Sequence, residues 1–363
     1  MARSIVVRIP SKKGLMCVGL VLAVMVLSLV TSVLTRGQVD PPAPGPQEQL
    51  QTAPALDMQE PRLPAAPTRA QGLLENNTVF TVYGRAFDRA PILGRLGTYK
   101  NFDAMAEDLP KWVDQVKKLN DHKPVVPGVH LIYALAVPCQ ERGDCLQYLE
   151  GPASLIIDNY IKPAAERGWI VVLDTQLGRS NPVAQVNRMI EKGYLKYENV
   201  HVAIDPEFHV YPDKLTPGIP VGTVEAAQIN EVQRILDDYV KSQGFKTKKM
   251  LIVHQFIDQA VSVGTRTMIE NKKEIRTFEN VELVIDADGL GTPSLKVWKY
   301  NRMTDAKTYP SIRFRGIKIF YPNTWEKAGH FDKPPMTMEQ VFGIVPVSKL
   351  LQIATKPNLV IIA

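Results

Sequence analysis

The sequence predicts an α/β fold, a (β/α)8 TIM barrel preceded by an N-terminal transmembrane helix and a Pro-rich linker. After residue 76, eight short β-rich runs alternate with longer helical patterns, which is typical of parallel strands joined by crossover helices. The runs are nearly continuous in Val, Ile and Leu, as in strands that are buried on both faces. Eight such units in roughly 290 residues match the size of this barrel.

The N-terminal region is predicted to anchor the chain in a lipid bilayer. Residues 14–34 are uncharged and mostly apolar, and a spanning helix needs about 20 such residues. Residues 1–13 are basic, so the positive-inside rule keeps them in the cytoplasm and leaves the barrel extracytoplasmic. A cleaved signal peptide, which would make the protein secreted, is the alternative, but its apolar core is usually about 7–15 residues long.

Residues 35–75 are rich in Pro, Ala and Gln and have no apolar periodicity, so we expect an extended linker between the membrane and the barrel domain at 76–363.

The formal charge of +6 belongs mainly to the N-terminus. Residues 1–38 hold five basic residues and no acid; removing these five from 43 leaves 38 against 37 acids, or +1. The remainder is almost neutral, which argues against a nucleic-acid partner.

The predicted barrel strands are short and apolar. They are Thr78–Phe87, Val129–Val137, Trp169–Gln176, Val200–Phe208, Met250–Phe256, Val281–Asp286, Gly316–Tyr321 and Asn358–Ala363. The intervening helical patterns lie near Phe102–Leu119, Ala153–Arg167, Pro182–Lys192 and Val224–Gln243. An open doubly wound sheet is the alternative, but no Gly-rich phosphate-binding pattern follows the first strand.

Cys139 and Cys145 lie in the loop after the second predicted strand. Outside the cell we expect them to form a disulfide. Two free thiols are the alternative, and without a nearby histidine the pair is a weak metal signal.

Two acids, Asp205 and Glu207, end the fourth predicted strand. Residues i and i+2 of a strand share a face, with Cα atoms roughly 6.5 Å apart, and like charges that close raise one pKa. The C-terminal ends of the strands form the catalytic face of a TIM barrel. We therefore expect a functional site there; the structural alternative is that one acid accepts backbone amides and the other pairs with Lys318 or an arginine.

Other polar residues also occur at or near the strand ends. The candidate catalytic residues are Glu207, Asp205, Asp174, His254 and Asp286, and the candidate substrate-binding residues are Tyr133, Gln176, Gln255, Lys318 and Tyr321. His254 and Gln255 are adjacent, so only one of them can face the barrel axis. Each has a structural alternative: Asp286 could lead into a turn at Asp288-Gly289, and Lys318 could neutralise the acids.

Several motifs together resemble those of a family of exported bacterial proteins with glycoside-hydrolase-like TIM barrels. They are LDTQLGRS (Leu173–Ser180), AIDPEF (Ala203–Phe208), VGTVEAAQIN (Val221–Asn230), MLIVHQF (Met250–Phe256) and VIDADGLG (Val284–Gly291), continuing through GIKIFY to NLVIIA. The resemblance covers most of residues 78–363 and implies the barrel and an extracytoplasmic location, but no substrate. Phe208 departs from it, since a tryptophan is expected there.

Three functions are compatible with these residues. A glycoside hydrolase acting on cell-envelope or environmental polysaccharide needs two carboxyl groups, about 5–5.5 Å apart for retention or 6.5–9.5 Å for inversion, although the seventh predicted strand offers no carboxylate. A divalent-metal hydrolase is the second, with Asp174, Glu207, His254 and Asp286 as ligands. A non-catalytic barrel that binds glycan or another envelope component is the third. No cofactor other than a divalent metal is expected.

Overall fold

The computed structural model describes residues 69–87, 94–140, 143–149, 154–211, 214–258, 267–322 and 330–363. The predicted cytoplasmic N-terminus, the predicted span at 14–34 and the linker up to residue 68 lie outside these ranges. Within them, none of the helices combines the length and the apolar character that a membrane crossing requires.

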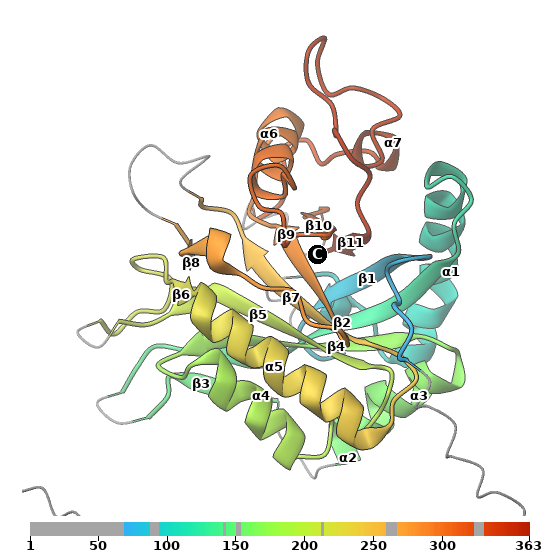
Figure 1. Ribbon diagram of the computed structural model, residues 1–363. Helices are drawn as coiled ribbons and strands as arrows, with labels where there is room; N and C mark the ends of the chain where they lie inside the picture. Colours follow the sequence, from blue (N-terminus) through green and yellow to red (C-terminus); the bar gives the residue numbers. More distant parts are fainter. Residues whose placement is uncertain are drawn as a thin grey trace, which may run out of the picture. The chain divides into compact units, whose positions relative to one another are not determined.

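The described chain forms a closed barrel of eight parallel strands (Figure 1). They are β1 (Thr78–Gly84), β2 (Val125–Ala136), β4 (Ile170–Gly178), β5 (Val200–His209), β7 (Lys249–Gln255), β9 (Val281–Ala287), β10 (Phe314–Ile319) and β11 (Leu359–Ile362). β1 pairs with both β2 and β11, which closes the sheet. The predicted barrel is thus confirmed, and the open doubly wound sheet is excluded.

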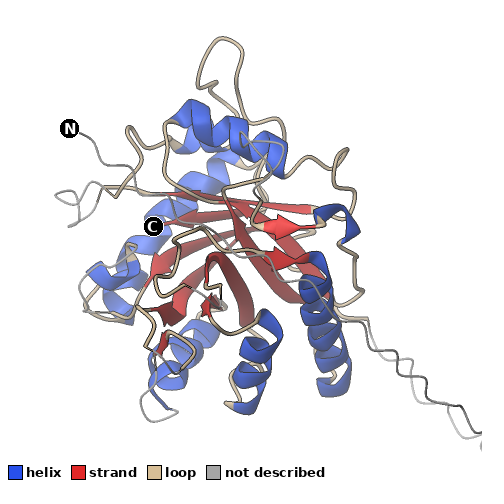
Figure 2. Ribbon diagram, turned by 90° about the vertical axis from the view of Figure 1, so that its left-hand side faces the viewer, coloured by secondary structure: helices blue, strands red, loops and turns tan. Residues whose placement is uncertain are grey.

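Helices lie between most of the strands and surround the sheet (Figure 2). They are α1 (Phe102–Leu119), the segment α2 (Ser154–Ile156), η2 (Ile157–Ile161) and α3 (Lys162–Glu166), then α4 (Pro182–Glu191), α5 (Ala226–Gln243), α6 (Pro293–Met303) and α7 (Met338–Val341). In the described part of the connection from β7 to β9, the only helical turn is η3 (Lys272–Glu274).

Side-chain caps define where the longer helices begin. Asn101 and Asn181 accept hydrogen bonds from the backbone of the third residue of α1 and α4, and Thr292 does the same for α6. Glu225 and Gln228 form a capping box at the start of α5. These caps satisfy amide groups that have no partner within the helix.

Three short strands lie outside the barrel. β3 (Leu146–Tyr148) pairs antiparallel with β2, and β6 (Val224–Glu225) pairs with β8 (Ile269–Glu270). The loop between β2 and β3 carries the disulfide between Cys139 and Cys145, which confirms that prediction.

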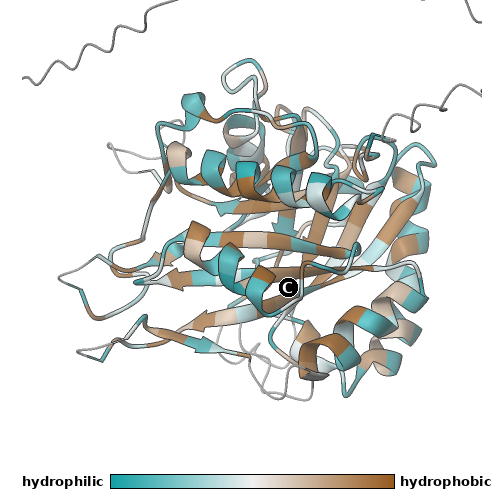
Figure 3. Cartoon of the chain, turned by 60° about the horizontal axis from the view of Figure 1, so that its bottom comes forward, coloured by the Kyte–Doolittle hydropathy of each residue, from teal (hydrophilic) through white to brown (hydrophobic). Residues whose placement is uncertain are grey.

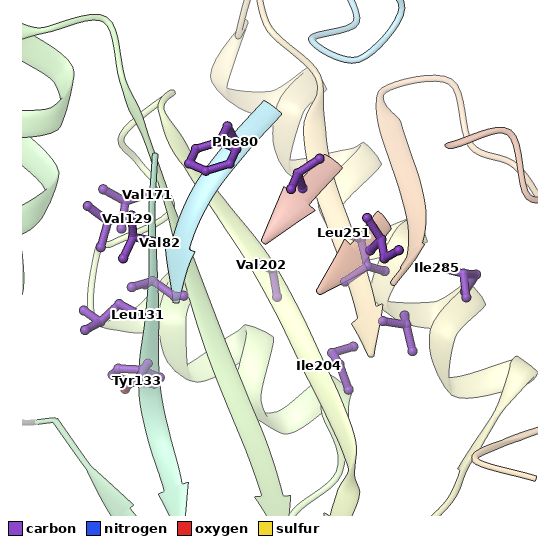
Figure 4. Packing of buried hydrophobic residues seen from close by; sticks show 14 of the residues in the cluster. Phe80, Val82, Val129, Leu131, Tyr133, Val171, Val202, Ile204, Leu251 and Ile285 are labelled. Carbon is purple, nitrogen blue, oxygen red and sulfur yellow. The ribbon is translucent and has the colours of Figure 1, made fainter. Parts of the chain in front are cut away.

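The hydrophobic core has two layers, because successive strand residues point to opposite faces of the sheet. The outer layer packs between strands and helices; it includes Phe80, Val129, Val202 and Leu251, shown as sticks in Figure 4. Hydrophilic and hydrophobic residues alternate along the helices that surround the sheet (Figure 3). The inner layer fills the N-terminal half of the barrel and consists of residues such as Val79, Val172, Met250, Ile252, Val284 and Leu359.

The segment before β1 closes the N-terminal end of the barrel. Leu74 is buried in the inner layer, and the Glu282 carboxylate accepts hydrogen bonds from the backbone amides of Leu73 and Leu74. Residues 69–75, expected to be linker, are therefore part of the folded domain. His201 lies at this end, and its Nδ1 accepts a hydrogen bond from the Met250 amide.

Candidate functional site

Toward the C-terminal ends of the strands, the inward positions change from apolar to polar. On β4 the inward residue after Val172 is Asp174, and on β7 the one after Ile252 is His254. We call the resulting cluster the polar core; it comprises Thr81, Tyr83, His130, Asp174, Gln176, Asp205, Glu207, His254, Asp286, Asp288 and Lys318. The barrel thus brings together seven of the ten predicted site residues.

His254 is the centre of a buried chain of ionisable groups. Its Nδ1 lies 2.8 Å from Asp286 Oδ2, and its Nε2 lies 3.5 Å from Asp174 Oδ2. The first contact is a hydrogen bond, whereas the second is an ion-pair distance. Burial and Lys318 act to lower the pKa of His254, but Asp174 and Asp286 outweigh them and raise it well above its usual range.

His130 on β2 was not among the predicted site residues. Its Nε2 lies 3.8 Å from Asp174 Oδ2, and its ring lies 5.0 Å from the ring of Tyr83 and 5.3 Å from that of His254. Burial lowers the pKa of His130 well below its usual range, and the opposing effect of Asp174 is smaller. The lowered pKa favours the neutral imidazole, in which one ring nitrogen carries the proton and the other offers a lone pair.

Several polar atoms in this region have no hydrogen-bond partner among the described residues. They are both nitrogens of His130, both oxygens of Asp174, Nε2 of His254, Oδ1 of Asp286, Nε2 of Gln176 and Oγ1 of Thr81. Buried polar atoms are nearly always hydrogen-bonded in folded proteins. Such a concentration inside one barrel is typical of a site that binds water, an ion or another ligand.

Lys318 and Asp288 form an ion pair on the opposite side of His254 from Asp174. Lys318 Nζ lies 3.0 Å from Asp288 Oδ2 and 3.4 Å from the centre of the Tyr83 ring. Burial acts to raise the pKa of Asp288, but Lys318 and His254 outweigh it and lower the pKa to about 2. Lys318 therefore forms a salt bridge, but with Asp288 rather than with Asp205 or Glu207. Asp288, expected in a turn at the end of its strand, is also part of the polar core.

Asp205 and Glu207 lie at the end of β5. Burial, reinforced by Glu207, raises the pKa of Asp205 well above its usual range. Burial, reinforced by Asp288, raises the pKa of Glu207 to about 7, although Lys318 opposes this. Glu207 is the one member of the polar core that is only partly buried, so it is the carboxyl group that a molecule from solvent reaches first.

Three of the predicted substrate-binding residues, Tyr133, Gln255 and Tyr321, lie outside the polar core. Tyr133 packs in the outer layer, where its ring lies 5.7 Å from Tyr194. Gln255 accepts a hydrogen bond from Lys272 Nζ on the helix side. Tyr321 donates to the Met336 carbonyl. Gln176 does face inward, and its Oε1 accepts from the Ala136 amide.

His130 and Tyr83 were not predicted as site residues. Their inward direction follows from the alternation of strand residues between the two faces of the sheet. His130 shares a face with Ile132 of the inner layer, and Tyr83 shares a face with Val79. A histidine within an otherwise apolar strand was the available signal, because its ring needs a polar partner when buried.

Two groups of buried residues bring possible metal ligands within 4.8 Å of one another. They are His130, Asp174 and His254, and His254, Asp286 and Asp288. Glu207 belongs to neither group, so the predicted four-residue ligand set is not assembled as such. The broader expectation, that buried His and Asp groups could hold a divalent metal, agrees with this arrangement.

Comparison of the chain with protein-family models and with curated proteins finds no match.

Proposed function

We propose that the protein is a membrane-anchored, extracytoplasmic hydrolase of the glycosidase type, in which Glu207 is the proton donor. The observation that carries this proposal is the position of Glu207, a partly buried carboxyl group at the mouth of the barrel above a buried polar core. Catalytic groups in this fold come from the C-terminal strand ends. A general acid there has to be protonated near neutral pH.

The surroundings of Glu207 suit this role. Its pKa of about 7 keeps a substantial fraction protonated at neutral pH. Asp288, which is ion-paired with Lys318, remains a carboxylate and is the candidate for the second catalytic group. Environments that push the pKa values of two carboxyl groups apart are typical of glycosidases, which need one acid and one base or nucleophile.

The proposed location outside the cytoplasm has independent support from the Cys139–Cys145 disulfide. Disulfides persist mainly in oxidising compartments. The substrate would then be a cell-envelope or environmental polysaccharide, and the resemblance to exported glycoside-hydrolase-like proteins points the same way.

The proposal is tested with the full-length protein in detergent against a panel of bacterial and plant polysaccharides, measuring released reducing ends. We expect hydrolysis of at least one polysaccharide, and a loss of 100-fold or more in Glu207→Gln, since general acids contribute about 10²–10⁴ in rate.

Glu231→Gln is the matched control, because Glu231 lies on the exposed face of α5 in an ion pair with Arg234. This control should retain the wild-type rate. Equal rates for wild type and Glu207→Gln would contradict the proposal, as would polysaccharide binding without hydrolysis.

A further inference from the structure

Three of the unpartnered atoms of the polar core lie close together. Asp174 Oδ2 lies 3.5 Å from His254 Nε2 and 3.8 Å from His130 Nε2, and the three residues are fully buried. None of these three atoms has a hydrogen-bond partner among the described residues. We propose that His130, Asp174 and His254 bind one divalent transition-metal ion, with Asp286 orienting His254. None of the three ligands is Glu207, so the proposal does not rest on the role of Glu207 as proton donor.

The spacing suits a small transition-metal ion. Zinc binds histidine nitrogen and carboxylate oxygen at about 2.0–2.2 Å in tetrahedral geometry, which places two ligand atoms about 3.4 Å apart. The two measured separations, 3.5 and 3.8 Å, are close to this value. Three protein ligands leave a fourth position for water or another ligand.

The hydrogen bond on the far side of His254 supports the same conclusion. Histidine ligands usually donate their other ring N–H to a carboxylate, which fixes the tautomer and the ring orientation. Here His254 Nδ1 lies 2.8 Å from Asp286 Oδ2. With the proton on Nδ1, the lone pair of Nε2 lies on the side of Asp174 and His130.

A doubly protonated His254 between Asp286 and Asp174 would explain part of this arrangement without a metal. It would leave both nitrogens of His130 and Oδ1 of Asp174 without partners. A divalent ion gives His130 and Asp174 a partner.

The donor set indicates the class of ion. Two imidazoles and one carboxylate suit Zn²⁺ or Fe²⁺, whereas Mg²⁺ and Ca²⁺ prefer oxygen ligands. Zn²⁺ is therefore the appropriate probe.

The test is isothermal titration of the tag-free, full-length protein in detergent after removal of metal with EDTA. We expect one tightly bound Zn²⁺ per chain and an increase in Tm with Zn²⁺ but not with the same concentration of Mg²⁺, because an ion that binds only the folded state stabilises it. Binding of Mg²⁺ in preference to Zn²⁺, or no increase in Tm with Zn²⁺, would overturn the proposal without any variant.

Variants then locate the site. Asp174→Asn and His130→Gln should each weaken Zn²⁺ binding at least 100-fold, and Asp286→Asn should weaken it about 10–100-fold, as outer-shell changes do. His201→Gln is the matched control, since His201 is a buried histidine with an unpartnered Nε2 at the other end of the barrel. Circular dichroism of the metal-free proteins verifies folding. Wild-type affinity in folded His130→Gln would overturn the assignment.

Discussion

Asp205 and Glu207 lie two residues apart on one strand face, yet their surroundings differ. Asp205 is 3% exposed and Glu207 is only partly buried. The Asp205 carboxylate accepts a hydrogen bond from the Glu207 amide, whereas burial and the neighbouring acids disfavour its ionised form. A buried carboxyl group whose ionised form is disfavoured lowers the stability of the folded protein at neutral pH. Such a loss of stability is common at functional sites.

Replacement of Asp205 by Asn should therefore stabilise the protein in a pH-dependent way. The folded-state pKa of Asp205 is raised, so its contribution to stability is fully present below the unfolded pKa of about 4 and is lost as pH rises toward the folded pKa. Asn cannot ionise and still offers an oxygen to the Glu207 amide. We expect Asp205→Asn to increase the free energy of unfolding by about 1–3 kcal/mol at pH 7, the usual cost of an unfavourably buried polar group.

Urea unfolding at pH 7 and pH 4 measures this difference. Little difference between wild type and Asp205→Asn is expected at pH 4, where both carry an uncharged side chain at this position. A variant that is less stable than wild type at pH 7 would show that Asp205 is ionised and stabilising.

At the scale of the elements, strand pairing positions the ionisable groups. Gly316 on β10 pairs with Asp286 on β9, and Lys318 follows on the same inward face. A Cβ atom at position 316 would lie 2.8 Å from Asp286 Oδ1. The absence of a side chain at Gly316 therefore leaves room for Asp286 to reach His254.

Larger side chains at position 316 should displace Asp286 and destabilise the barrel. Overpacking a well-packed interior typically costs about 1–3 kcal/mol, so we expect a loss of this size in the free energy of unfolding of Gly316→Val and a smaller loss in Gly316→Ala. Chemical denaturation of wild type and the two variants measures their free energies of unfolding and so gives the order of stability. If the free energies of unfolding of both variants lie within about 0.5 kcal/mol of the wild-type value, the interior has free space next to position 316.

At the scale of the whole molecule, the barrel depends on closure. β11 lies between β1 and β10 and pairs with both in parallel. Without it, two strands that are buried on both faces would expose their backbone edges, and edges of this kind promote aggregation.

Deletion of residues 358–363 should therefore prevent folding. We expect the truncated protein to aggregate or to be sensitive to protease. The control is the replacement of Lys349 and Leu350, in the preceding exposed segment, by two alanines, which should leave the protein soluble. Limited proteolysis and size-exclusion chromatography distinguish these outcomes. A truncated chain with wild-type protease resistance would mean that closure contributes little.

Much of the barrel could be predicted from the sequence, because buried parallel strands are continuous apolar runs and their number indicates closure. The strand faces were harder to predict. The irregularity between Ile132 and Ala134 of β2 changes its register against β4, and the closed barrel determines which alternate positions face inward. Of the adjacent pair His254 and Gln255, His254 is the one that faces inward. Tyr133 lies in the outer layer, and His130 was not predicted.

Part of the site could be predicted from the charged residues at the strand ends. Two acids at the end of β5 predicted a raised pKa, and the structure raises the pKa of both. The ion pair of Asp288 with Lys318 joins strand ends that are 30 residues apart in sequence, and no local pattern reports such a contact. The helices α6 and α7 were also missed, because α7 has only four residues and the apolar periodicity of α6 is weaker than that of α4.

The most direct test of Glu207 as a proton donor is its own protonation state. Infrared difference spectra of metal-free wild type and Glu207→Gln, recorded from pH 5 to pH 9, report protonated carboxyl groups through their C=O stretching band. We expect wild type to contain a carboxyl group that loses its proton near pH 7 and is missing in Glu207→Gln, while Glu231→Gln retains it. If replacing Glu207 removes no protonated carboxyl group above pH 5, Glu207 is already ionised near neutrality and cannot be the proton donor.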